Sequence, residues 1–155
     1  MASLWWLIFA VVVWGITIAL VKWENFKRHW IAGIIGMIAV IIIDSPLSKG
    51  GIYLFHQPMI QVFNLPLFYI IGLYAGGVFI VHFYPWGNPI KGLLFLILAD
   101  FIFLSFEVFM DYIGLFEHVH WKFLYSFFIN ITGFLLTLYF YIIVQHLLGN
   151  KSYSI

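Results

Sequence analysis

Five apolar segments, each close to the length of a membrane-spanning helix, take up most of this 155-residue chain. A helix needs about 20 mostly apolar residues to cross a hydrocarbon core roughly 30 Å thick. Lipid offers no partner for backbone N–H and C=O groups, so the segments must form helices. They lie at about 4–21, 30–47, 65–84, 90–110 and 122–148. The pattern predicts an all-α fold, a polytopic transmembrane helical bundle of about five spans, in a single domain covering 1–155.

Composition excludes several classes of protein. The chain is 65% hydrophobic and 8% charged, whereas a soluble domain carries about 25% charged residues. The net charge is +1 and no Lys/Arg block is present, so we expect no nucleic acid. The expected surroundings are the lipid bilayer, with a membrane-protein partner or a homo-oligomer as further candidates. With no cysteine, GxSxG or HExxH, nothing in the sequence predicts a cofactor or a catalytic residue, and whether the chain is an enzyme stays open.

The connector "SKGGIYLFHQPMIQVFN" between the second and third spans is too long for a tight turn and too apolar for a solvated loop. Pro58 prevents a continuous helix, because proline lacks the N–H donor and clashes with the preceding turn. We therefore expect an interfacial or re-entrant segment over about 48–64, most simply a short interfacial helix.

The fourth span carries acids on one face. Asp100, Glu107 and Asp111 lie seven and eleven residues apart, which places them nearly above one another on a helix. A charged carboxylate at the bilayer centre costs roughly 2.5–3.5 kcal/mol, so Asp100 and Glu107 should face the bundle interior. Asp44, near the end of the second span, is expected to share a proton with Glu107 if the two spans are adjacent.

The last span offers a matching polar face. Ser126, Asn130, Gly133 and Thr137 follow at spacings of four, three and four residues, and small or hydroxyl residues at such spacing join helices in lipid. In an antiparallel pair, Ser126 should lie near Glu107, and Asn130 near Asp100. The candidate residues of an intramembrane polar site are Asp44, Asp100, Glu107, Asp111, Ser126, Asn130 and Thr137.

Two interpretations of these residues stay open. They can simply hold the bundle together, or they can line a wet functional pocket. The sequence favours a non-enzymatic partner-binding, sensing or assembly component, because 155 residues leave little room for a pair of transporter repeats. One alternative is proton or cation transport along the acidic stripe. A second is an acid–base enzyme acting on a lipid-soluble substrate such as an isoprenoid.

Histidines in two connectors are weak candidates for a metal site. "FEHVHWK" contains Glu117, His118 and His120, and His56 lies in the connector described above. These side chains are zinc or copper ligands elsewhere. Short H-x-H pairs are nevertheless common in loops, so we predict no metal here.

Glycines are spaced for close helix contacts in two spans. Gly72 and Gly76 form a GxxxG pair, and Gly33 and Gly36 lie on the second span. Such residues let backbones approach closely, and we expect them to pack helices within one bundle.

The stretch "FEVFMDYIGLFEHVHWKFLYSF" resembles a family of small five-span membrane proteins of spore-forming Firmicutes whose function is not assigned. The resemblance rests on Glu107 in the fourth span, on Glu117 and His118 in the connector, and on the residues that open the last span, which are Trp121, Tyr125 and Ser126. It implies a multi-pass protein of the plasma membrane, and it supplies no substrate, catalytic residue or partner.

Lys and Arg are distributed unequally between the two ends of the spans. If the connector "KWENFKRHW" is cytoplasmic, that side holds Lys22, Lys27, Arg28, Lys91 and Lys151, and the other side holds Lys49 and Lys122. Loops rich in Lys and Arg stay in the cytoplasm. We therefore predict an extracytoplasmic N-terminus and a cytoplasmic C-terminus.

Fusions to alkaline phosphatase, which is active only outside the cytoplasm, test this topology. A fusion after Asn150 should be inactive and one at Gly51 active, because the charge bias places these points on opposite sides. The reverse pair of activities would overturn the topology.

Overall fold

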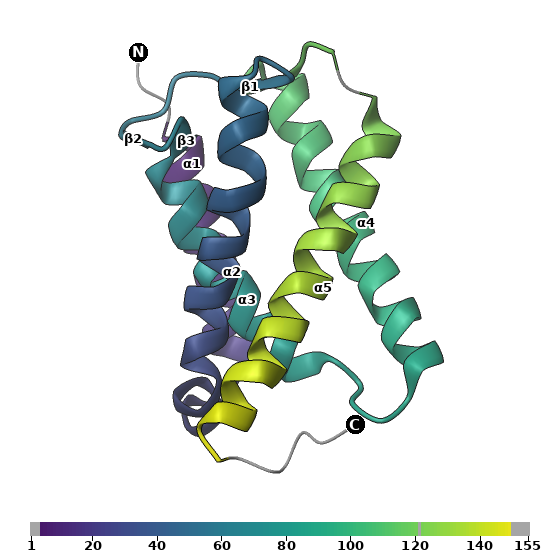
Figure 1. Ribbon diagram of the computed structural model, residues 1–155. Coiled ribbons are helices and arrows are strands. Elements are labelled where there is room, and N and C mark those ends of the chain that lie inside the picture. The colour runs from purple at the N-terminus through teal and green to yellow at the C-terminus, as the bar shows by residue number, and fades with distance from the viewer. Residues whose placement is uncertain (1–3, 121, 150–155) are drawn as a thin grey trace.

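A computed structural model describes residues 4–120 and 122–149, so Trp121, Asn150 and Lys151 lie outside the described residues. Its main elements are the helices α1 (Trp5–Leu20), α2 (Trp23–Lys49), α3 (Leu67–Phe83), α4 (Pro89–Tyr112) and α5 (Phe123–Leu147). Figure 1 shows them side by side, with successive helices running in opposite directions. The predicted helical segments are thus confirmed, although α2 is longer than expected because it begins at Trp23.

Three of these helices, α2, α4 and α5, are long enough and apolar enough to cross a membrane. The other two, α1 and α3, are apolar but have 16 and 17 residues. At about 1.5 Å per residue they extend roughly 24–26 Å, a few ångströms less than the hydrocarbon core, and a bilayer accommodates such a mismatch at modest cost. The chain is therefore a polytopic membrane protein by its helices.

Local sequence explains where α4 begins and why α2 continues past its proline. The Asn88 side chain accepts a hydrogen bond of 3.0 Å from the Lys91 N–H, and Pro89 occupies the first turn, as is typical of a helix start. Pro46 lies in the last turn of α2, where its own carbonyl still accepts the Gly50 N–H at 2.9 Å.

Helix α3 packs closely against both α1 and α2. A Cβ at Gly77 would lie 2.5 Å from the Ala32 carbonyl oxygen of α2, and one at Gly72 would lie 2.6 Å from the Phe9 ring of α1. At Gly76 a Cβ would meet only the Leu73 side chain, at 3.8 Å. Of the predicted Gly72 and Gly76 pair, only Gly72 mediates a close contact, since Gly77 faces α2 in place of Gly76.

The connector predicted at about 48–64 forms no helix of its own after α2 ends at Lys49, so the expected short helix is wrong, while an interfacial or re-entrant position of this segment stays a prediction. Between α2 and α3 the chain forms β1 (Tyr53–Phe55) and a hairpin of β2 (Gln61–Val62) with β3 (Leu65–Pro66). Strand β1 pairs with β4 (Phe116–His118) from the α4–α5 connector, in antiparallel register with Tyr53 opposite His118. The physical reason is that a distant partner strand satisfies the backbone groups of this apolar segment, which local helix formation cannot do beside Pro58.

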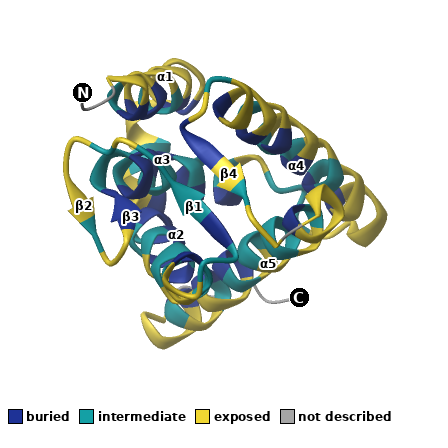
Figure 2. Cartoon of the chain, turned by 90° about the horizontal axis from the view of Figure 1, so that it is seen from above, coloured by how far each residue is buried: buried dark blue, intermediate teal, exposed yellow. Residues whose placement is uncertain are grey.

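The β1–β4 pair covers one end of the bundle, and we call it the lid. Viewed from above in Figure 2, it lies across the space between α1, α2 and α3 on one side and α4 and α5 on the other. The Trp6 indole of α1 donates a hydrogen bond of 3.2 Å to the His56 carbonyl, just after β1. The lid is thereby held to α1 as well.

Alanine substitutions at two adjacent glycines test the α2–α3 contact. Gly77→Ala should destabilise the protein by about 1–3 kcal/mol, since overpacking a close contact costs this much, and should lower the melting temperature in detergent. Gly76→Ala is the matched control and should leave it unchanged or raise it slightly, because alanine is the better helix former. Equal melting temperatures for the two variants would contradict the contact.

Candidate functional site

Two buried carboxyl groups lie beneath the lid. Asp44, on α2, accepts a hydrogen bond of 2.7 Å at each oxygen, one from the Tyr53 hydroxyl of β1 and one from the Tyr69 hydroxyl of α3. The side chain is 8% exposed. Both of its oxygens are therefore hydrogen-bonded to neutral donors, as a buried carboxyl requires.

Glu107, on α4, is the second carboxyl. Its Oε1 accepts a hydrogen bond of 2.6 Å from the Ser126 hydroxyl of α5, as the spacing on the last span predicts. The His118 Nε2 of β4 lies 2.7 Å from the same oxygen. Because Tyr53 and His118 face each other in the lid, each acid is held by one lid residue. We call Asp44, Tyr53, Tyr69, Glu107, His118 and Ser126 the acid cluster.

The charges of the cluster affect its lid residues. The hydrogen bond with Glu107 raises the pKa of His118 above its ordinary value, and the nearby carboxylate of Asp111 adds to the rise, although partial burial opposes it. Burial, followed by the proximity of Asp44, raises the pKa of the Tyr53 hydroxyl. Tyr53 is thus a permanent donor, and His118 favours its protonated form.

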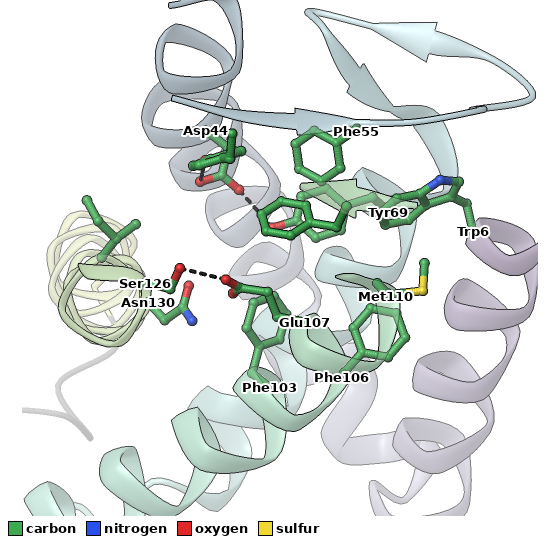
Figure 3. A pocket seen from close by; sticks show the side chains of 13 residues that line it. Trp6, Asp44, Phe55, Tyr69, Phe103, Phe106, Glu107, Met110, Ser126 and Asn130 are labelled. Atoms are coloured by element: carbon green, nitrogen blue, oxygen red, sulfur yellow. Dashed lines mark hydrogen bonds between the residues drawn. The ribbon is translucent and has the colours of Figure 1, made fainter. Parts of the chain in front are cut away.

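A small cavity of about 30 Å³ lies among these side chains. Figure 3 shows the Glu107 carboxyl pointing into it between Ser126 and Asn130 on one side and Tyr69 on the other. Such a volume is sufficient for a water molecule or for a small polar group.

A much larger apolar cavity, of about 550 Å³, adjoins the small one. Residues of α1, α2, α3, α4 and α5 line it. The residues that line both cavities are Asp44, Tyr69, Phe103, Phe106, Ile129 and Asn130. The large apolar cavity thus adjoins the small polar one at the acid cluster.

Asp100 and Asn130 meet in the interface between α4 and α5. Asp100 is fully buried at 0% exposure, as predicted from its cost in lipid. Asn130 approaches its carboxyl, yet among the described residues neither Asp100 oxygen nor the Asn130 Nδ2 has a partner at hydrogen-bond distance. Asn130 thus borders the small cavity beside the acid cluster, and its buried amide donor and both Asp100 oxygens are left unused among the described residues.

The remaining predicted site residues lie outside the acid cluster. Thr137 is buried and lines the large cavity, but its hydroxyl donates to the Gly133 carbonyl of its own helix at 2.8 Å. Asp111 is exposed, and its Oδ2 lies 3.8 Å from the His118 Nδ1. Among the described residues no hydrogen bond joins Asp44 to Glu107, since each acid has its own donors.

The four weak metal candidates do not form one group, because they lie on different faces of the lid. Alternation along β4 places Glu117 on the outer face of the lid, where it pairs with His56 at 2.8 Å, and turns His118 toward Glu107 on the inner face. His120 is exposed. Within the part of the chain that the structure describes, no group of three His, Cys, Asp or Glu side chains is arranged to hold a metal ion.

Several polar residues of the bundle are not predicted from the sequence. No sequence pattern distinguishes Tyr53 and Tyr69 from the other aromatic residues, and only the fold places their hydroxyls beside Asp44. At the other end of the bundle, the His29 Nδ1 of α2 lies 2.7 Å from the Tyr141 hydroxyl of α5, and Gln145 is buried nearby along that helix. The spacing of four from Thr137 continues to Tyr141 and Gln145, and that signal could have identified both.

No protein-family model, curated protein or solved structure matches this chain. The resemblance to the Firmicutes family therefore stays a prediction.

The raised pKa of His118 predicts a pH-dependent stability. A group whose pKa is higher in the folded state contributes its full stabilisation below the unfolded pKa, 6.5 for histidine, and loses it as the pH rises through the folded pKa. The melting temperature should therefore fall above neutral pH. A fall of about 2–4 °C would correspond to about 1 kcal/mol in a chain of this size.

His118→Gln should remove this dependence, and His56→Gln, which affects only the exposed pair with Glu117, should retain it. Thermal unfolding of all three proteins in one detergent, between pH 6 and pH 9, measures the effect. A wild-type melting temperature that rises over this range would contradict the ion pair.

Proposed function

We propose that this membrane protein binds a lipid-soluble molecule, with the apolar chain of the molecule in the large cavity and its polar end at the acid cluster. The observation that carries the proposal is the continuity of the two cavities, which share six lining residues including Asp44 and Asn130. Ligand sites are mostly apolar cavities with a few convergent polar groups, and this arrangement has both parts.

The large cavity is accessible from the side of the bundle. Among its lining residues, Ile8 and Val12 of α1 are 43% and 50% exposed, and Ile102 of α4 is 67% exposed. Helices α1 and α4 border the opening, and their outer surfaces are apolar enough to face lipid. A molecule dissolved in the bilayer can therefore reach the cavity without passing through water.

The volume of the cavity limits the length of the apolar chain that the bound molecule can have. An apolar cavity of about 150 Å³ holds one benzene molecule. At the same density, 550 Å³ accommodates an apolar chain of about twenty carbon atoms, the size of an isoprenoid or a fatty acyl chain.

The same geometry weighs against a transport path. Beyond Asn130, Thr132 of α5 is exposed and donates to the Phe128 carbonyl. The next buried polar side chain on this helix is Thr137, which also donates to a carbonyl of its own helix. Past it, Tyr141 is packed in an apolar cluster with Leu138 and Leu96. Apolar side chains thus separate the polar groups near the lid from His29 at the other end, and a proton or cation would have no continuous set of partners along α5 there.

The cavity favours a ligand over the partner-binding or assembly role that the sequence alone suggests. A sensing role is compatible with the proposal, since a bound lipid-soluble molecule can be the signal. Acid–base chemistry on that molecule is compatible too, because Asp44 and Glu107 both line the small cavity. The proposal includes five membrane crossings in the plasma membrane, with the lid on the extracytoplasmic side and the C-terminus in the cytoplasm.

Filling the cavity tests this function. Gly133→Leu should abolish retention of a co-purifying lipid-soluble molecule, because Gly133 lines the cavity and a Cβ there meets only Ile43, at 3.7 Å. Gly15→Leu is the matched control, since a Cβ at Gly15 meets nothing within 4 Å and Gly15 is not a cavity residue. Native mass spectrometry of protein purified in mild detergent measures bound mass. Equal bound mass in wild type and Gly133→Leu would contradict the site.

A further inference from the structure

We infer that the polar end of the bound molecule is an uncharged hydroxyl group, so that the ligand is a long-chain or isoprenoid alcohol. This inference rests on the proposed function and specifies its ligand. It follows from the charges around the two cavities and from the hydrogen-bonding positions that the acid cluster leaves unused.

An anionic head group does not fit this site. Among the described residues that line either cavity, none is Lys or Arg, whereas Asp44 and Glu107 are both present. A phosphate or carboxylate would lie beside like charges with no cation to pair it, and buried charges are tolerated only when paired. This chemistry excludes phospholipids, fatty acids and isoprenoid phosphates.

A cationic head group is also disfavoured. His118 already lies 2.7 Å from Glu107 and supplies its counter-charge, and Asp44 is held by two tyrosine hydroxyls. An ammonium group would bring a second positive charge to Glu107, whose charge His118 already balances. It would also have to pass along an apolar cavity, where an unpaired charge is costly. The head group should therefore be neutral.

The vacant positions at Glu107 and Asn130 select a hydroxyl among neutral groups. Both hydrogen bonds to Glu107 end on Oε1, and within the described residues none ends on Oε2, so the carboxylate offers an acceptor that a ligand must donate to. The unpaired amide of Asn130 lines the same cavity. A hydroxyl can donate to Glu107 and accept from Asn130, whereas an aldehyde or ketone can only accept.

Binding of five compounds with one chain tests the inference. They are an isoprenoid alcohol of about twenty carbons, the aldehyde, the monophosphate, the amine and the hydrocarbon of the same chain. Each is titrated into purified wild-type protein in detergent, and Kd is measured by native mass spectrometry. The alcohol should bind about tenfold or more tightly than the aldehyde, since a buried acceptor left without a donor weakens binding by at least this factor.

Glu107→Gln provides the second measurement. With its oxygen kept toward Ser126 and His118, the glutamine presents an N–H donor where the wild type has Oε2, so the preference for alcohol over aldehyde should disappear. Glu117→Gln on the outer face of the lid is the matched control and should keep the preference. If Glu107→Gln fails to fold, the five affinities of the wild type decide alone.

The outcomes separate this inference from the proposed function. Tightest binding of the alcohol supports it. Tightest binding of the monophosphate, the amine or the aldehyde would show that the head group is not a hydroxyl, while the proposed lipid-binding site would stand. Equal affinity for the alcohol and the hydrocarbon would show that the acid cluster does not bind the head group, which would overturn the inference. Failure of all five compounds to bind would count against the proposed function itself.

Discussion

A carboxyl group surrounded by apolar side chains needs hydrogen-bond donors, since leaving it unpaired costs several kcal/mol. Asp44 and Glu107 obtain their donors from four elements that are distant in the chain: Tyr53 from β1, Tyr69 from α3, Ser126 from α5 and His118 from β4. Each bond joins two of the packed elements. The two acids therefore determine how the lid sits on the bundle, and the lid in turn closes the small polar cavity.

The large cavity has two causes, which are the small residues in its walls and the lipid that surrounds the helices. Its walls include Ala39, Gly76, Ala99 and Gly133, whose small side chains leave space between the helices. In water such a space would be closed by the hydrophobic effect, but lipid tails are as apolar as the walls and provide little force to close it. Figure 1 shows α4 diverging from α5 toward its N-terminal end, and the lid holds only the opposite end.

The sequence predicts the helices well, because apolar length and helical spacing are local signals. The inward direction of Asp100 and Glu107 and the contact of Ser126 with Glu107 also follow from the cost of charge in lipid and from the spacing of four. The lid could not be predicted in this way. Its strands are three residues long, and their partners lie more than sixty residues apart, so neither strand has a local pattern that distinguishes it from an apolar loop.

The same limit applies to the site. The sequence predicts a proton shared by Asp44 and Glu107 only if the second and fourth spans are adjacent, and in the structure Asp44 is bonded by two tyrosines instead. These tyrosines are indistinguishable in sequence from the other aromatic residues of a chain that is 22% aromatic. The cavity is also invisible in sequence, because it depends on which glycine faces which helix. Gly77, adjacent to the predicted Gly76, makes the close contact with α2, and both glycines border the cavity.

An experimental density map of the protein in a lipid nanodisc, supplied with membrane extract, tests the central claim most directly. The account predicts an elongated non-protein density that enters between α1 and α4, fills the apolar cavity and ends within hydrogen-bond distance of Glu107. A map in which α4 closes against α1 and leaves no space between them, with the acid cluster intact, would contradict it.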